Sequence, residues 1–417
     1  MDRAIECMFA EYQKELLEEY DIFALEGGYE TGSYSEEGIC RRLAYYGAGN
    51  MEQDISRIQF LTDSQGLAFY EQVTRYMEHK YGISQAEELL GKTDTWRQQE
   101  EKAREHEKAE KEKEAELERL LLENEGELPR QDNPIAHADS LKSMSILALV
   151  VPKEMQVSEK VINLSDTVSH RELNQGYGDF SDVADVSDSS GTALDILFGE
   201  YVTEHFSTAL GEQKTRALDY EIEYILEGKG SDRENLEKVA EKLLLFRLVP
   251  NYVYIQSDAR MRAEAEALAL TLCSLLAVPA ITEAAAQVLL LAWAYGESVM
   301  DIRALLSGNR VPLTKSRDSW QLSLSSLLTL GTEEDNHSGA DTEGGMRYEE
   351  YLRMLLFLEK QEIIGSRALD LIEQNLRRQL GQEYFRADYC ISKIELLTTC
   401  TFRRGITYRF PTYFGYR

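Results

Sequence analysis

Four aspartates spaced three residues apart form the most suggestive group of metal-ligating side chains in this sequence. Asp179, Asp182, Asp185 and Asp188 lie in a Ser-rich segment that we expect to be a loop. Oxygen ligands on a flexible loop suit Ca²⁺. The segment lacks the central Gly and terminal Glu of an EF-hand loop. The sequence therefore favours a solvated acidic loop over a calcium site.

Glu221 and Glu223 are candidates for an acid–base pair, because such catalysis uses two carboxyl groups in different environments. They lie in segment 219–226, where Tyr and Ile alternate with Glu. This alternation fits either a half-buried strand or the first turns of a helix. In a strand both carboxylates would lie on one outward face, where we expect them to be solvated rather than catalytic.

The other residue types capable of chemistry form no complete motif. The six histidines include no pair four residues apart and no H-E-x-x-H, which argues against a zinc site. Residues 228–231 read Gly-Lys-Gly-Ser, but Glu223 stands where a phosphate-binding loop requires Gly, so a turn before a capped helix is favoured. No G-x-S-x-G or local Cys–His signature is present. The sequence predicts no catalytic, cofactor-binding or metal-ligating residue.

The chain is strongly acidic. Its 417 residues include 74 Asp and Glu against 45 Lys and Arg, which gives a net charge of −29. This balance repels nucleic acid and anionic lipid, so neither is an expected partner. The five cysteines include no C-x-x-C pair. Cys390 and Cys400 are too far apart on one expected strand to form a disulfide, and we expect each thiol to be free and buried.

An Ala- and Leu-rich stretch at 257–308 is the element that organises the rest. It contains two long uncharged runs, and Ala and Leu are strong helix formers. Pro279 ends the first half. We expect two helices, at about 258–277 and 282–307, that are apolar on most of their circumference and form a central buried hairpin. A membrane hairpin is the alternative, but each uncharged run is shorter than the about 20 residues that cross a bilayer.

Periodicity along the rest of the chain predicts an α+β fold that is predominantly α-helical. Helices are expected at about 2–20, 50–61, 64–81, 193–210, 231–248 and, in two pieces, 347–381. Residues 389–402 and 405–410 are expected to form a C-terminal β-hairpin, and 20–25 a short strand that joins it in a small antiparallel sheet.

Composition divides the chain into three expected regions. Residues 1–95 form an N-terminal helix–strand region. Residues 96–134 contain a run of mixed charges with favourable Glu-to-Lys spacing and no sustained heptad, which predicts a solvated helical linker. Residues 135–417 form the main α+β domain, with the helical hairpin and the C-terminal β-hairpin.

Several short blocks resemble one family. They are residues 11–25, 149–180, 217–236, 290–324, 347–358 and the tail from Phe385. Together they resemble a domain-of-unknown-function family of Firmicutes, common in gut clostridia, that occurs with tight-adherence (Tad/Flp) pilus gene clusters. The resemblance covers nearly the whole chain except 96–126. It carries no catalytic residue to any position here.

This resemblance implies a placement at the extracellular side of the membrane. Members of the family begin with a membrane segment that leads into the helix expected here at 2–20. This chain lacks that segment, so the resemblance implies a soluble form whose anchor is missing. It implies other pilus or cell-surface proteins as partners.

We therefore expect a non-enzymatic structural or assembly component of the cell surface, associated with a Tad-like pilus. Two alternatives remain open. A surface module that binds glycan or protein would use an exposed aromatic patch, which a chain with 23 Tyr could supply. A surface hydrolase would need a deep pocket with converging titratable groups. The sequence leaves the ligand, the oligomeric state and cation binding at 179–188 open.

Overall fold

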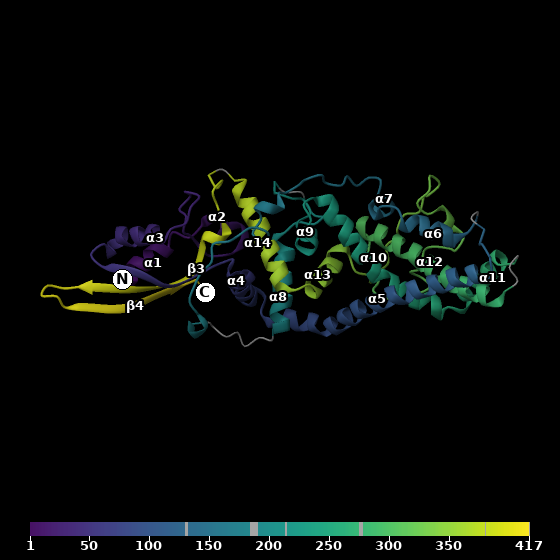
Figure 1. Cartoon of the computed structure of the whole chain (residues 1–417), viewed down its shortest axis with the longest axis horizontal. Helices are drawn as coiled ribbons and strands as arrows, with labels where there is room; N and C mark the ends of the chain where they lie inside the picture. The colour runs from purple at the N-terminus through teal and green to yellow at the C-terminus, as the bar shows by residue number, and fades with distance from the viewer. Residues whose placement is uncertain (130–131, 184–190, 213–214, 275–277, 380, 417) are drawn as a thin grey trace. The chain divides into compact units, whose positions relative to one another are not determined.

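The protein has an α+β fold that is mostly helical, as its sequence predicts. The computed structural model describes residues 1–129, 132–183, 191–212, 215–274, 278–379 and 381–416 (Figure 1). The chain forms two compact units. Unit 1 comprises Met1–Lys92, Glu159–Asp232 and Leu355–Arg417, and unit 2 comprises Thr93–Ser158 and Arg233–Met354. Each unit draws on segments that are distant in sequence, whereas the three expected regions follow chain order.

Unit 1 contains a small antiparallel sheet around the strand β3 (Cys390–Thr401). This strand pairs with β1 (Leu25–Glu26), β2 (Glu52–Phe60) and β4 (Thr407–Gly415). The expected C-terminal hairpin is confirmed. Of the strand expected at 20–25, only Leu25 lies in a strand, β1, and Tyr20 belongs to the helix before it.

The helix expected at 50–61 is wrong, because these residues form β2. A bulge between Ile55 and Arg57 shifts the register of β2 against β3. It therefore brings Ile55 and Ile58, three residues apart, onto the same face of the sheet. Apolar residues three apart are typical of one face of a helix. Here the bulge places residues at this spacing on one face of a strand.

Helices α1 (Asp2–Phe9) and α3 (Glu36–Leu43) cover one face of this sheet, and a short π-helical turn (Ala44–Ala48) follows α3. Their apolar side chains form one buried cluster with the sheet. Its members include Ile5, Met8 and Phe9 from α1, Ile39 and Leu43 from α3, and Ile394 and Leu396 from β3.

The single helix expected at 2–20 is instead two helices, α1 and α2 (Lys14–Tyr20). Gln13 caps α2, because its side-chain oxygen accepts a hydrogen bond from Leu16 N at 2.9 Å. This cap starts a new helix after the break.

The remainder of unit 1 is a helical layer around α14 (Gln361–Arg377). This helix contacts α2, α4 (Asp63–Tyr81) and α9 (Glu221–Glu227), and α4 also contacts α8 (Gly191–His205). Helices at 64–81 and 193–210 and a two-piece helix at 347–381 are confirmed. Segment 219–226, which fitted either a strand or a helix, is helical.

Helix α12 (Pro279–Leu306) forms the core of unit 2, and nearly every residue from Ala285 to Leu306 is buried. It contacts α6 (Pro134–Lys142), α7 (Ile146–Val150) and α11 (Ala259–Leu272). The expected helical hairpin is thus confirmed as α11 and α12. No helix in the described part of the chain combines the length and apolar character that crossing a bilayer requires.

Two details of the expected helices in unit 2 are wrong. Helix α11 is not apolar around most of its circumference: it buries Met261, Ala265, Ala269 and Leu272, whereas Leu270 is 64% exposed. Helix α10 (Asp232–Ser257) does not end before Pro250 but continues through it. Helix α13 (Tyr348–Leu358) includes the point in the chain, between Met354 and Leu355, where unit 2 ends and unit 1 resumes.

The charged stretch expected as a solvated linker belongs to a long helix, α5 (Ile83–Glu123). Within unit 2, Trp96, Ala103, Glu110 and Leu117 are all buried. These residues are seven apart, so α5 packs through a narrow seam of single residues, without the apolar a and d positions of a coiled coil. The expected helix is confirmed, and only its complete solvation is wrong, because Ala and Glu occupy seam positions, where the sequence alone shows no apolar repeat.

Candidate functional site

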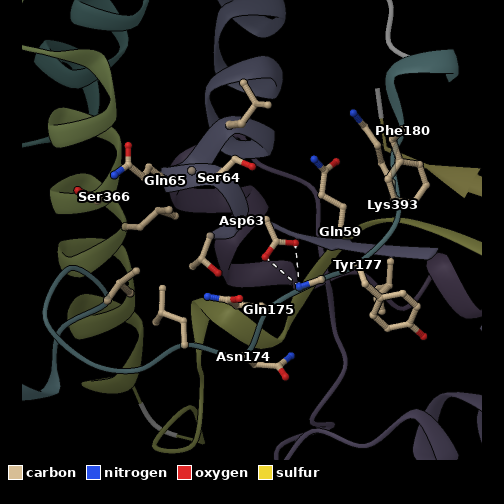
Figure 2. A pocket seen from close by; sticks show the side chains of 18 of the residues that line it. Gln59, Asp63, Ser64, Gln65, Asn174, Gln175, Tyr177, Phe180, Ser366 and Lys393 are labelled. Atoms are coloured by element: carbon tan, nitrogen blue, oxygen red, sulfur yellow. Dashed lines mark hydrogen bonds between the residues drawn. The ribbon is translucent and has the colours of Figure 1, made fainter.

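Unit 1 contains a cavity of about 830 Å³. Its walls come from the end of β2, the start of α4, the loop 168–181, helix α14 and Lys393 on β3. Figure 2 shows the side chains that surround it, with Asp63 in the middle of the view. This volume is within the range of small-molecule sites in proteins.

The start of α4 forms one wall through an unusual turn. Ser64, Gln65 and Gly66 all have left-handed backbone angles, with φ of 50°, 60° and 86°. A left-handed conformation costs a non-glycine residue roughly 1–2 kcal/mol. The turn directs successive residues of the helix start towards the cavity, which a regular helix would not do.

Asp63 fixes this turn to its surroundings. Its carboxylate accepts hydrogen bonds from Phe60 N at 2.7 Å and from Gly176 N at 3.0 and 3.2 Å. Burial raises the pKa of Asp63, although both backbone donors oppose that shift. Asp63 therefore joins the strand, the helix start and the loop.

The loop 168–181 is anchored to α14 at its beginning. Ser169 donates two hydrogen bonds to Asp370, from its backbone N at 2.8 Å and from its Oγ at 2.6 Å, and Tyr224 donates another at 2.7 Å. Burial raises the pKa of Asp370 to about 6, because these hydrogen bonds only partly offset the loss of solvent.

Arg171 forms the second anchor of the loop. It binds Glu373 through two parallel hydrogen bonds of 2.7 and 2.8 Å and Asp388 at 2.6 Å. Both carboxylates are almost completely buried. Further along, Asn174 N donates to Asp388 at 2.9 Å, and the backbone of Tyr177 pairs with Ile58 on β2. The loop is therefore held at four successive points.

The charged side chains that line the cavity are all engaged with protein groups. Besides Asp63 and Arg171, Lys393 binds Glu71 at 2.7 Å, and Asp179 accepts hydrogen bonds from Ser181 N and Oγ at 2.9 and 2.7 Å. The lining also includes neutral amides and hydroxyls, namely Gln59, Gln65, Asn174, Gln175, Thr62, Ser64, Ser169, Ser181 and Ser366. The groups best placed to receive a ligand are therefore neutral and polar.

Among the described residues that line the cavity, three polar atoms are buried without a hydrogen-bond partner. They are Thr62 Oγ1, Gln59 Oε1 and Arg171 Nε, and Thr62 as a whole is only 5% exposed. An unsatisfied buried polar atom costs about 1–3 kcal/mol. Because solvent does not reach these atoms, they lie behind the surface that a ligand in the cavity would contact.

A family model, for a family of unknown function named DUF5702, matches residues 124–402. The chain belongs to this family. The match includes the loop 168–181, α14 and Lys393, whereas the walls made by β2 and α4 precede it. The search of curated proteins and the search of solved structures found no match.

Of the four spaced aspartates, Asp179 and Asp182 lie beside this cavity, and Asp185 and Asp188 lie outside the described residues. Arg57 on β2 binds Asp182 at 2.5 Å and packs over the Phe180 ring at 4.8 Å. The start of this loop is therefore tied to the sheet and is not simply solvated. Among the residues that the structure describes, no group of three or more His, Cys, Asp or Glu could hold a metal ion.

Glu221 and Glu223 were expected to be solvated, and this expectation is wrong. Both are fully buried at the start of α9. Glu221 accepts hydrogen bonds from Ser207 N at 2.9 Å and Arg216 at 2.7 Å, and Glu223 accepts one from Ala209 N at 2.9 Å. Because the segment is a helix, its Glu residues do not share one outward face. They hold the chain that follows α8.

The other predicted positions have structural contacts. Gly228 ends α9 with a left-handed φ of 64°, so the Gly-Lys-Gly-Ser segment is a turn before α10, as expected. The cysteines are free, but only Cys273 and Cys390 are buried, whereas Cys7 is exposed.

The anchors of the cavity and a second group of charges were not among the residues predicted from the sequence. In unit 2, Lys315 binds Glu297 at 2.6 Å and Asp301 at 2.7 Å, and Arg247 binds Asp301 at 2.9 Å. All four side chains are buried. The signal was present, because Glu297 and Asp301 are four residues apart in an otherwise apolar helix, and Asp370 and Glu373 are three apart in α14.

Proposed function

We propose that this protein is a non-enzymatic component of the cell surface that holds a neutral glycan in the cavity of unit 1. The single observation that supports binding rather than catalysis is the state of the lining. Its charged groups are paired with one another or with backbone atoms, while amides and hydroxyls face the ligand space (Figure 2). A general acid or base would need to reach a reacting atom, and these carboxylates already serve the protein.

The chemistry of the wall favours a sugar over a charged small molecule. Each sugar hydroxyl can both donate and accept, as the amides of Gln59, Gln65 and Gln175 can between their two atoms. A charged ligand of either sign would meet paired side chains of its own sign in the same wall, Asp63 and Glu71 or Arg171 and Lys393.

The assembly part of the proposal is supported by the resemblance to proteins encoded in tight-adherence pilus clusters. A surface component of this kind would use the cavity to recognise cell-wall or host glycan and would contact other pilus or surface proteins. Deletion of the gene in its native host should reduce piliation or adherence. Unchanged pili and adherence would count against the assembly role without affecting the binding result.

Binding can be measured by calorimetry with neutral oligosaccharides released from cell-wall and mucin glycans. Substitution of Gln59 or Gln175 by Ala removes one hydrogen-bonding amide from the wall, worth about 0.5–1.5 kcal/mol. The dissociation constant should therefore rise roughly twofold to tenfold for each variant.

The matched control is Asn336→Ala, which removes an exposed amide in unit 2. It should leave the dissociation constant unchanged. Cleavage of the bound oligosaccharide, abolished by Asp63→Asn, would replace this proposal with the surface hydrolase. Failure of every neutral glycan to bind would also overturn it.

A further inference from the structure

The β3–β4 hairpin extends beyond the rest of its sheet. Strand β2 begins at Glu52, which lies opposite Thr399, so β2 does not accompany β3 past Thr399. Past that point, Cys400 pairs with Tyr408 and Thr401 with Thr407, and Phe402 N donates to Ile406 O at 2.8 Å. Three further pairs at about 3.4 Å each give a two-stranded ribbon of about 10 Å before the turn. Figure 1 shows this hairpin in yellow, reaching past the ribbons of α1 and α3.

One face of this ribbon continues the apolar face that α1 and α3 cover nearer its base. Ile394 and Leu396 are completely buried there. Because side chains alternate along a strand, Phe402, Ile406 and Tyr408 point to the same side as these residues. They are 59%, 57% and 64% exposed. The apolar side chains on this face therefore reach about 10 Å past the end of β2.

The ribbon also lacks the acidic residues that dominate the rest of the chain. Residues 396–416 contain no Asp or Glu, although the whole chain has a net charge of −29. Arg403 and Arg404 occupy the turn and are exposed, and Arg409 lies on β4, 4.0 Å from Asp54 of β2. The outer end of the hairpin is consequently apolar on one side and cationic at its tip.

We propose that this hairpin tip, defined as residues 400–409, docks on an anionic lipid surface. Phe402, Ile406 and Tyr408 enter the boundary between headgroups and acyl chains, and Arg403 and Arg404 meet lipid phosphates. Surface-bound segments place their apolar side chains about 5–10 Å deep, and the ribbon supplies about that length.

The geometry explains how an acidic protein can approach such a surface. Electrostatic repulsion is screened over about 8 Å at physiological ionic strength. A tip that projects about 10 Å past β2 keeps its turn at about that distance or further from Glu52 and Asp54, which lie opposite Thr399 and Leu397. An acidic protein partner would require a larger contact, since stable protein interfaces bury about 800 Å² on each side, and three apolar side chains on a narrow ribbon supply little of that area.

The test is sedimentation of the whole chain with two kinds of vesicle, phosphatidylcholine alone and phosphatidylcholine with phosphatidylglycerol. The protein should sediment with the anionic vesicles and remain in solution with the neutral ones. Raising the salt concentration from about 0.1 M to about 1 M shortens the screening length from about 10 Å to about 3 Å and should release it.

Two sets of substitutions separate the two contributions. The charge variant, R403Q with R404Q, should lower the partition coefficient about 30-fold, since each cation near an anionic bilayer is worth about fivefold. The apolar variant, F402S with I406S and Y408S, should abolish sedimentation. All these side chains are exposed, so the variants should keep the melting temperature of the parent.

The matched control is V253S with L270S, which removes two side chains of unit 2 that are 60% and 64% exposed. It should sediment like the parent. Three results would overturn the proposal: no sedimentation of the parent, equal sedimentation of parent and tip variants, or self-association that the tip substitutions abolish in the absence of vesicles. Glycan binding by the cavity should be unchanged in the tip variants, so the two proposals fail separately.

Discussion

In unit 2, Arg247 donates a hydrogen bond from Nε to Oδ2 of Asp301 at 2.9 Å, and both side chains are fully buried. Lys315 binds the other oxygen of Asp301 and also Glu297. Two positive and two negative side chains thus neutralise one another inside the helical core. Burial raises the pKa of Glu297 to about 7, whereas Arg247 and Lys315 outweigh burial at Asp301 and lower its pKa.

Replacing Asp301 by Ala should destabilise the protein strongly. The change leaves the Arg247 and Lys315 charges buried with one carboxylate between them, and loss of one partner of a buried pair costs about 3–5 kcal/mol. Urea unfolding followed by circular dichroism measures the difference. As a control, Glu241→Ala breaks the exposed pair of Lys238 and Glu241 and should change stability by less than about 1 kcal/mol. An equal loss of unfolding free energy in both variants would contradict the expectation that Arg247 and Lys315 depend on Asp301 for their burial.

Gly176→Ala should open the wall of the cavity. A Cβ at this position would lie 2.2 Å from Ile58 O and 2.3 Å from the Asp63 carboxylate. The loop would have to leave β2, with the loss of the hydrogen bonds that Asp63 accepts. We expect lower stability and no glycan binding, measured by thermal unfolding and calorimetry.

Gly199→Ala is the control for that substitution. Gly199 lies inside α8, and a Cβ there would meet nothing within 4 Å. Ala is favoured over Gly in a helix interior by about 0.5–1 kcal/mol, so this variant should be slightly more stable and bind normally. Similar behaviour of the two variants would contradict the steric argument.

The elements with strong local signals could be predicted from the sequence. The buried α12, the two-piece helix before the sheet and the terminal hairpin all follow from apolar periodicity and from residues that stop helices. Errors occurred where a local pattern had two structural causes. Ile55 and Ile58, which are three apart in the sequence, lie on the same face of β2 because of a bulge. The seam of α5 contains Ala103 and Glu110 in place of large apolar residues.

The candidate site could not be predicted, because its parts come together only in the fold. Asp63, Ser169, Asp370 and Lys393 lie far apart in the sequence and belong to no local motif. Three left-handed residues in a row, including Ser64 and Gln65, leave no signature beyond Gly66. The sequence signal for the anchors of the loop is a pair of acidic residues at helical spacing, Asp370 and Glu373, between apolar residues of α14.

Asp370 should make stability depend on pH between about 4 and 6. Its pKa is raised from 3.8 to about 6 in the folded chain. Below pH 4 the carboxyl is protonated in both states. Between pH 4 and 6 the folded chain retains a proton that the unfolded chain has released, so the contribution of Asp370 falls as pH rises, by about 3 kcal/mol in all, and is level above pH 6.

This dependence can be isolated with Asp370→Asn, which cannot titrate. The unfolding free energy of the parent minus that of the variant should decrease as pH rises from 4 to 6. A constant offset from the altered hydrogen bonds does not affect that slope. A difference that increases with pH would mean that the hydrogen bonds from Ser169 and Tyr224 outweigh burial.

Arg171→Lys should loosen the loop that closes the cavity while leaving its charge in place. The guanidinium makes two parallel hydrogen bonds to Glu373 and a third to Asp388, and an ammonium group cannot reproduce this planar geometry. Each hydrogen bond to a charged group is worth about 1.5–3 kcal/mol. Amide hydrogen exchange should therefore accelerate at Asn174–Tyr177, and glycan affinity should fall with it.

Arg104→Lys provides the matched control, because Arg104 is 77% exposed and pairs with Glu100 on the surface of α5. Exposed pairs contribute about 0–1 kcal/mol, so exchange and affinity should match the parent. The informative comparison is local. Faster exchange confined to the loop places Arg171 as the anchor of the cavity, whereas equal acceleration throughout unit 1 would assign it to general stability. Unchanged exchange in the loop would mean that Ser169 and Asp63 hold it without Arg171.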